Sequence, residues 1–169
     1  RKVLREISDK RLIEHIIERV KMVESIDDIY LCTSKNGNDQ ILVDIAADNY
    51  INSYCGSENS VIDRMLDVAE ITNADNLIRI TGDNIFTEPY YLEEMIKFHK
   101  KNDADYTRTE YLPIGVTAEV MKLSALKDCY NKIDPNKSEY LFLYMFDPDF
   151  YNCVVLVPCS KHQKPFASL

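Results

Sequence analysis

The stretch LIRITGDNIFTEP, residues 77–89, joins a predicted strand to a predicted helix through an acidic turn. Its opening residues are strand formers, and their nearly continuous apolar character predicts a strand over residues 76–81 that is buried on both faces. Gly82 and Asp83 follow as a turn signal. Pro89 stands in the expected first turn of the next helix, where a missing N–H group is tolerated. An acidic side chain is thereby expected at the tip of a core strand.

Strand and helix patterns alternate on both sides of this stretch. Apolar spacings of three and four residues predict helices over residues 11–25, 40–49, 56–74, 88–102, 124–133 and 138–146. Runs of β-forming residues predict strands over residues 28–34, 50–55, 76–81, 104–109, 115–122 and 152–158. This order gives βαβ units, so we expect an α/β fold with a doubly wound, mostly parallel sheet and helices on both faces. In such sheets ligands bind at the carboxyl ends of the strands, where Asp83 is expected.

Serine residues mark the expected beginnings of two helices. Ser57 or Ser60 is a candidate N-cap for the helix over 56–74, and Ser124 is the candidate for the helix over 124–133. A serine hydroxyl at such a position accepts a hydrogen bond from a backbone N–H group that the helix leaves without a partner. These positions therefore predict where the two helices begin.

The composition is that of one globular domain. The chain has 169 residues, of which 46% are hydrophobic and 28% charged, enough to build a core without disulfide or metal support. No run is long and apolar enough to cross a bilayer, and no signal-peptide pattern opens the chain, so we expect a cytoplasmic protein with no membrane partner. A net charge of −8 argues against a nucleic-acid partner, whose phosphates require a basic surface.

The cysteines are expected to be reduced thiols, most of them buried. There are five of them, none forms a CxxC pair, and most lie beside apolar residues. A structural zinc site is therefore not expected. The three histidines do not cluster in the sequence.

Asp83 has two interpretations that the residues alone leave open. It is either a ligand of a divalent cation, since Mg²⁺ takes few protein carboxylates and completes its shell with water and phosphates, or a cap of the turn that follows it. Arg79 points toward a phosphate or forms an internal ion pair, and the sequence alone favours the ion pair. No nucleophile or phosphate-loop motif is present. Metal-assisted phosphoryl or nucleotidyl transfer therefore fits better than covalent catalysis.

Six fragments, taken in order, resemble one family of enzymes. They are RKVLREI, LIEHIIERV, IDDIYLCTS, GSENSVIDR, ADNLIRITGDNIFTEP and GVTAEVM. Together they resemble the cytidylyltransferases that make CMP-activated sugars, above all the spore-coat polysaccharide F-type branch, with the acylneuraminate and 3-deoxy-manno-octulosonate enzymes as more distant relatives. The resemblance covers residues 1–158 and implies a Rossmann-like fold of the nucleotide-diphospho-sugar transferase type.

The resemblance implies a role for each matching residue. Lys2 would contact the triphosphate and Asp83 would bind Mg²⁺, and both would be catalytic. The nucleotide-binding residues would be Arg1, Lys2, Ser57, Glu58, Arg64, Arg79 and Gly82. The sugar-binding residues would be Gly115, Glu119 and Tyr140. The enzyme would transfer CMP from CTP to a sugar, expected to be an acidic sugar for a cell-surface polysaccharide, and release pyrophosphate.

Four positions depart from the family pattern, so the residues leave alternatives to the cytidylyltransferase function. Asn84, Thr117, Ser138 and Tyr140 stand where the family usually has Cys, Asp, Arg and His. The alternatives are another nucleotide-sugar pyrophosphorylase or a glycosyltransferase of the same fold, or a non-catalytic nucleotide-binding relative. A DPD triplet at residues 147–149 matches the metal motif of glycosyltransferases, although a loop is the simpler interpretation.

The resemblance also implies an organisation for the chain. We expect residues 1–169 to form a single nucleotidyltransferase domain that lacks the family's first strand with its nucleotide loop and its C-terminal segment. A homodimer is expected as well. The aromatic and aliphatic stretches 110–116 and 140–146 are candidates for its interface.

Overall fold

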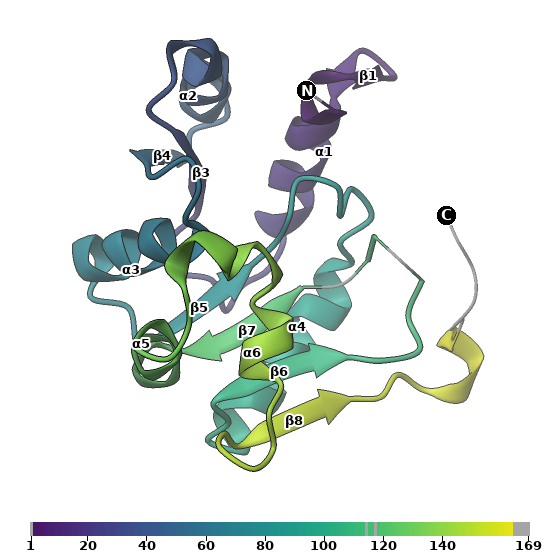
Figure 1. Cartoon of the computed structure of the whole chain (residues 1–169). Helices are drawn as coiled ribbons and strands as arrows, with labels where there is room; N and C mark the ends of the chain where they lie inside the picture. Colours follow the sequence, from purple (N-terminus) through teal and green to yellow (C-terminus); the bar gives the residue numbers. More distant parts are fainter. Residues whose placement is uncertain (1, 114, 117, 164–169) are drawn as a thin grey trace. The chain divides into compact units, whose positions relative to one another are not determined.

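The computed structural model describes residues 2–113, 115–116 and 118–163 (Figure 1). Two compact units divide the chain. The first holds the described residues of Arg1–Ile26, Ile78–Val120 and Asn152–Leu169, and the second holds Asp27–Leu77 and Met121–Tyr151. The expectation of a single nucleotidyltransferase domain stays a prediction.

The first unit begins with the 3-10 helix η1 (Lys2–Leu4) and a short antiparallel hairpin of β1 (Glu6–Ile7) and β2 (Lys10–Arg11). Its helices are α1 (Leu12–Val20), α4 (Pro89–Lys101) and the 3-10 helix η4 (Ser160–His162). Its strands β6 (Tyr106–Thr109) and β8 (Cys153–Leu156) pair in parallel. They belong to a sheet of order β5-β7-β6-β8, in which β5 is Asn76–Arg79 and β7 is Glu119–Lys122.

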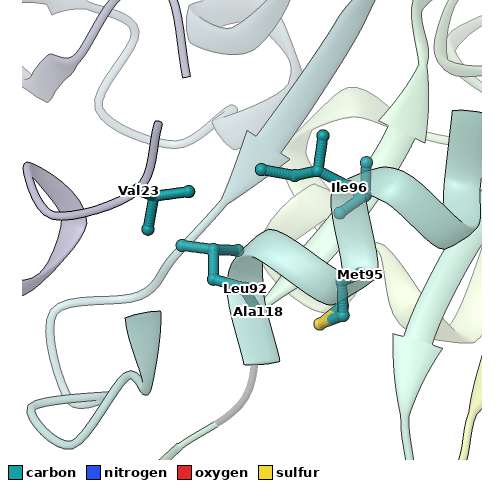
Figure 2. Packing of buried hydrophobic residues seen from close by; sticks show 6 residues of the cluster. Val23, Leu92, Met95, Ile96 and Ala118 are labelled. Atoms are coloured by element: carbon teal, nitrogen blue, oxygen red, sulfur yellow. The ribbon is translucent and has the colours of Figure 1, made fainter. Parts of the chain in front are cut away.

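The core of the first unit packs α4 against one face of this sheet. The buried apolar cluster contains Val23, Leu92, Met95, Ile96, Ala118 and Val120 (Figure 2). Ile78 and Ile80 of the β5 segment pack against the same cluster. Because side chains alternate between the faces of a strand, Arg79 and Glu119 point to the opposite face. The sheet therefore has an apolar face toward α4 and a face that carries charged groups.

The second unit contains the strands β3 (Tyr30–Ser34) and β4 (Asn52–Gly56), which pair in parallel with Ser34 opposite Gly56. The segment between them forms the 3-10 helix η2 (Gly37–Asp39) and α2 (Gln40–Asp48). After β4 comes α3 (Val61–Thr72). The later part of this unit forms α5 (Leu123–Tyr130), the 3-10 helix η3 (Pro135–Tyr140) and α6 (Phe142–Met145).

The α/β prediction is confirmed, and so is the position of most elements. Pro89 is in the first turn of α4, and the Ser60 hydroxyl caps α3 by accepting from the Asp63 N–H group at 3.2 Å. The expected cap at Ser124 is wrong, because α5 begins at Leu123 after the N-cap Lys122 and Ser124 lies inside the helix. The hairpin of β1 and β2 was not expected, because its turn uses Ser8 and Asp9 at positive φ rather than a glycine.

Two expectations about burial are wrong. Every residue of β5 is half-buried rather than buried on both faces, because Arg79 occupies one of those faces. Of the five cysteines, which were expected to be mostly buried, only Cys129 is buried. Cys159 is exposed and the other three are partly exposed, since they lie on strands with half-buried residues. In the part of the chain that the structure describes, no helix has the length and apolar character needed to cross a membrane.

Candidate functional site

The acidic turn after β5 presents Asp83 to solvent. The Thr81 hydroxyl donates a hydrogen bond to the Asp83 carboxylate. The turn itself is closed by the backbone bond from the Asn84 N–H group to the Thr81 carbonyl, at 3.0 Å. The Asn84 carbonyl in turn accepts from the Thr87 N–H group at 3.0 Å. The Thr81 hydroxyl thus orients the Asp83 carboxylate, which is exposed to solvent and therefore accessible to a ligand.

The N-terminal segment packs directly on this turn. A Cβ atom added at Gly82 would lie 2.5 Å from the Val3 Cγ1 atom, a separation that packed carbon atoms do not tolerate. Gly82 is therefore required for the close approach of η1. Lys2, the exposed residue before Val3, is held on the same short helix. The structure thus brings the segment of Lys2 to the turn of Asp83.

A third segment reaches the same turn from the loop between β6 and β7. The Gly115 carbonyl accepts a hydrogen bond from the Phe86 N–H group at 3.2 Å. A Cβ atom at Gly115 would lie 3.8 Å from the Asp83 backbone oxygen, which places the two residues in contact. Gly115 has a φ angle of 91°, a conformation that favours glycine.

Arg79 and Glu119 form an ion pair on the charged face of the sheet. The Tyr106 hydroxyl donates to the other oxygen of the Glu119 carboxylate at 2.6 Å. The side chains of Arg79 and Glu119 are each 15% exposed, and Tyr106 is fully buried. Burial, together with the Glu119 carboxylate, raises the pKa of the Tyr106 hydroxyl, which therefore remains a donor at neutral pH. The ion pair that the sequence alone favoured for Arg79 is confirmed.

In the second unit, Arg64 holds the loop that follows β4. Its Nη1 atom donates to the backbone carbonyls of Ser57 and Glu58. Gly56 allows this arrangement, since a Cβ atom there would lie 2.8 Å from Arg64 Cγ and 2.7 Å from Tyr54 Cε1. Arg64 therefore fixes the backbone of the Ser57–Glu58 loop, and the nucleotide-binding role that the resemblance implies for it stays a prediction.

A second contact in this unit fixes the start of α3. The Ser138 hydroxyl, which is buried, accepts from the Ile62 N–H group at 3.0 Å and donates to the Pro135 carbonyl at 2.5 Å. It thus satisfies an N–H group that the first turn of a helix leaves without a partner. Tyr140, two residues later, is 63% exposed.

All but two of the sequence-predicted site residues fall into three groups. In the first unit, the segments of Lys2, Gly82 with Asp83, and Gly115 meet at one turn. Arg79 and Glu119 pair on the sheet of that unit, and Ser57, Glu58 and Arg64 meet in the second unit together with Gly56. Tyr140 lies on η3 of the second unit, and Arg1 is outside the described residues. The binding roles of all these residues stay predictions.

The sequence reasoning missed Val3 and Tyr106. Val3 looked like an ordinary apolar residue of a terminal segment, and Tyr106 looked like an ordinary strand residue. Their contacts join positions far apart in the sequence. Tyr106 and Arg108 alternate with two threonines on β6, and this polar run is a local signal that could have drawn attention to the network.

Asp83 is the one residue that the sequence analysis names as a ligand of Mg²⁺, and this role stays a prediction. Within the described ranges, no group of three or more His, Cys, Asp and Glu side chains is arranged to hold a metal ion. Mg²⁺ does not need such a cage, because it binds through one or two carboxylates and takes its other ligands from water and substrate phosphates. The exposed carboxylate of Asp83 supplies a hard oxygen ligand of this kind.

Comparison with known proteins assigns the class of this chain. The profile of the family described as cytidylyltransferase matches residues 1–145, and the chain belongs to this family. It is 31% identical to the spore coat polysaccharide biosynthesis protein SpsF of Bacillus subtilis, in an alignment that covers 97% of this chain and 71% of SpsF. It is 28% identical to the protein MJ1063 of Methanocaldococcus jannaschii, over 93% of this chain and 65% of that relative.

Among solved structures, the fold is similar to that of a cytidylyltransferase from Leptospira borgpetersenii. The TM-score is 0.87 at 21% identity, and the match covers 96% of this chain and 72% of the other. The chain thus spans about two-thirds of the length of the relatives it matches.

Proposed function

We propose that the protein transfers CMP from CTP to a hydroxyl group of a sugar and releases pyrophosphate. Membership of the cytidylyltransferase family supports the nucleotide and the reaction class. The proposal names particular residues because three segments of the chain meet at the Asp83 turn. Val3 and Gly115, far apart in sequence, both contact the turn that presents this exposed carboxylate.

The roles of the residues follow from their charges. The exposed ammonium group of Lys2 would neutralise negative charge on the triphosphate. Asp83 would hold Mg²⁺, which when bound supplies Lewis-acid stabilisation to phosphate oxygens. The Ser57–Glu58 loop, kept in place by Arg64, would contribute to the nucleotide site.

The bonds that change are those of an ordinary nucleotidyl transfer. The sugar hydroxyl oxygen forms a bond to the α-phosphorus of CTP. The bond between that phosphorus and the bridging oxygen toward the β-phosphate breaks, and pyrophosphate leaves with the electron pair. The hydroxyl proton is released. The described chain needs no protein nucleophile for this chemistry, because positioning and charge neutralisation carry it.

Three finer features of the proposal rest on the resemblance. The sugar is an acidic one used for a cell-surface polysaccharide, a choice supported by the polysaccharide named in the description of SpsF. The protein works in the cytoplasm. It forms a homodimer, for which the exposed Tyr140 and Leu143, at 63% and 66%, are candidate interface residues.

The test combines nucleotide binding with turnover. Titration with CTP, UTP, ATP and GTP, with Mg²⁺ or with EDTA, is expected to give the tightest binding for CTP in Mg²⁺. Pyrophosphate release is then measured with CTP and a panel of nonulosonic acids. Asp83→Asn should lower turnover about a hundredfold or more, because it removes the metal ligand while keeping the shape of the side chain.

Asp149→Asn is the matched control, since Asp149 is another exposed aspartate, on a turn of the second unit. Unchanged activity in this variant would support the proposal. Turnover that survives Asp83→Asn would remove the assigned metal role. Transfer from a nucleotide-sugar donor that depends on Asp149 rather than Asp83 would favour the glycosyltransferase alternative, because Asp149 belongs to the DPD triplet.

A further inference from the structure

The guanidinium group of Arg19 reaches from α1 to the residues that join the Asp83 turn to α4. Its Nε atom donates to the Thr87 carbonyl, and its Nη2 atom donates to the Glu88 carboxylate at 2.8 Å. Glu88 is the N-cap residue of α4, but its side chain makes no cap bond. One planar side chain thus bonds two successive residues between the turn and the helix, because its donors are fixed in a fork.

The Thr87 carbonyl needs a donor of this kind. It lies before the N-cap of α4, and the carbonyl that the helix itself uses is that of Glu88, which accepts from the Leu92 N–H group at 2.9 Å. Thr87 is only 1% exposed, and a backbone carbonyl without a donor is costly in a buried residue. The bond from Arg19 to this carbonyl therefore matters more than the partly exposed ion pair with Glu88, which alone contributes little.

Thr87 transmits this anchoring to the turn. Its N–H group and its hydroxyl both donate to the Asn84 carbonyl, at 3.0 and 2.7 Å. The Asn84 N–H group donates to the Thr81 carbonyl at 3.0 Å, and the Thr81 hydroxyl donates to the Asp83 carboxylate. All of these residues lie in the described part of the chain. A continuous series of contacts thus joins Arg19 to the Asp83 carboxylate.

The geometry points to Arg19 as a positioning residue for the Asp83 carboxylate. By holding Thr87 it fixes the Asn84 carbonyl, and with it the turn in which Asp83 is oriented. A carboxylate that is already oriented loses less freedom when it binds a cation, so this anchoring should favour the binding of Mg²⁺. The metal-binding part of this inference rests on the proposed function, whereas the anchoring of the turn does not.

Arg19→Met keeps most of the apolar stem and removes both bonds. Ser25→Ala is the matched control, because Ser25 follows α1 and its hydroxyl donates to the carboxylate of Glu93, within α4, at 2.6 Å. Both variants lose a polar contact between the α1 segment and α4, so a difference between them reports on the turn. Arg19→Lys keeps the charge but offers one nitrogen atom in place of the fork, so its effects should fall between those of the wild type and Arg19→Met.

The anchoring is measured by hydrogen exchange of backbone amides followed by NMR. The Thr87 amide should exchange about tenfold faster in Arg19→Met, the lower end of the effect expected for losing a hydrogen bond to a charged group, because the Arg19 side chain is 36% exposed. The Ala104 amide, beyond the other end of α4, should change less. An unchanged Thr87 amide, equal acceleration of both amides, or the same acceleration of the Thr87 amide in Ser25→Ala would overturn the proposal, whether or not the enzyme turns over.

The consequence for the metal is measured by binding and by kinetics. Mn²⁺, a paramagnetic substitute for Mg²⁺, should broaden the amide signals of Gly82 and Asn84 in the presence of CTP. In Arg19→Met the Mn²⁺ concentration that gives half of this broadening should rise about tenfold, the lower end for a residue that supports a metal ligand through others. The Mg²⁺ concentration that gives half of the maximal rate should rise with it, whereas kcat at saturating Mg²⁺ should change less.

Nucleotide binding without metal separates this role from a general disturbance of the site. The Kd for CTP, measured in EDTA, should stay within about twofold of the wild type in Arg19→Met. A loss of CTP affinity as large as the loss of metal affinity would overturn the assignment to Asp83. A wild-type protein in which Mn²⁺ leaves the Gly82 and Asn84 signals unchanged would defeat the metal role in the proposed function, and the exchange experiment would still decide the anchoring.

Discussion

Val3 lies against the α-carbon of Gly82, so close that no larger residue fits at that position. A Cβ atom at Gly82 would come within 2.5 Å of Val3 Cγ1. This contact holds the short helix of Lys2 at the turn of Asp83. The segment that carries Lys2 therefore lies next to the turn that carries the Asp83 carboxylate.

Gly82→Ala should therefore displace η1 and weaken CTP binding. Overpacking of this kind typically lowers the free energy of unfolding by about 1–3 kcal/mol. Thermal unfolding and CTP titration measure the two effects. Gly37→Ala is the control, since no atom lies within 4 Å of a Cβ at Gly37. Adding Val3→Ala to Gly82→Ala removes the clashing methyl groups and should restore part of the stability, and no restoration would mean that the contact is not the cause.

Arg64→Met should loosen the loop after β4. The methionine keeps most of the apolar stem but loses the bonds to the Ser57 and Glu58 carbonyls. We expect a loss of about 1 kcal/mol in the free energy of unfolding, since the guanidinium is partly exposed, and weaker CTP binding. Lys127→Met, on the exposed side of α5, should change neither quantity. Wild-type affinity in Arg64→Met would show that the loop does not contribute to nucleotide binding.

The two serines that the sequence offered as helix caps should behave differently. Ser60→Ala removes the bond to the Asp63 N–H group and should cost about 1 kcal/mol of stability. Ser124→Ala should be neutral or slightly stabilising, because Ser124 is exposed inside α5 and alanine has the higher helix propensity. Chemical denaturation of both variants measures the difference. A cost at Ser124 as large as that at Ser60 would contradict the observed start of α5.

The cysteines should titrate and react in an order set by burial. Burial raises the pKa of the Cys129 thiol to about 11, and that of Cys32 likewise to about 11. At pH 8 a thiol reagent should modify the exposed Cys159 first and these two last, since the thiolate is the reactive form. Mass spectrometry of partly modified protein gives the order. Early modification of Cys129 in folded protein would contradict it.

The same shifts predict how stability depends on pH. Each thiol has a higher pKa folded than the ordinary value of 9.0. The folded state therefore retains protons that the unfolded chain releases above pH 9. This stabilising contribution is complete below pH 9 and is lost as the pH rises to about 11. The wild type should therefore lose stability between pH 9 and about 11 that Cys129→Ala does not lose. Chemical denaturation at several pH values measures the free energy of unfolding of both proteins, and the difference between them should become smaller over this range.

Local signals in the sequence predicted most of the fold. The apolar face of α1, Pro89 in α4 and the Ser60 cap depend on residues within a few positions of each other, so the sequence alone sufficed. The start of α5 was missed because the helix follows β7 directly, with Lys122 as both the last strand residue and the N-cap, and lysine gives no cap signal in the sequence. The burial of β5 was overestimated because Arg79 lies on one of its faces, and that of the cysteines because apolar neighbours in the sequence need not surround a thiol in space.

The candidate site could be predicted only in part. Asp83 and Gly82 stand out because a turn signal follows a strand, and the resemblance added the other residues. The contacts of Val3 with Gly82, and of Tyr106 with Glu119, join segments that only the folded chain brings together. The resemblance implies a nucleotide-binding role for Arg64, whereas its bonds to the backbone carbonyls of Ser57 and Glu58 are seen only in the structure.

The parallel pairing of β6 with β8 has a consequence for synthesis on the ribosome. The β3–β4 pair can form once Gly56 has emerged, because both strands and the helix between them are contiguous in the chain. Strand β6 can pair fully with β8 only when Leu156 has been translated. The segment Met121–Tyr151, which belongs to the second unit, is translated before that. Until then one edge of β6 stays open, so nascent chains stalled before Cys153 should be the ones most prone to recruit a strand from another molecule.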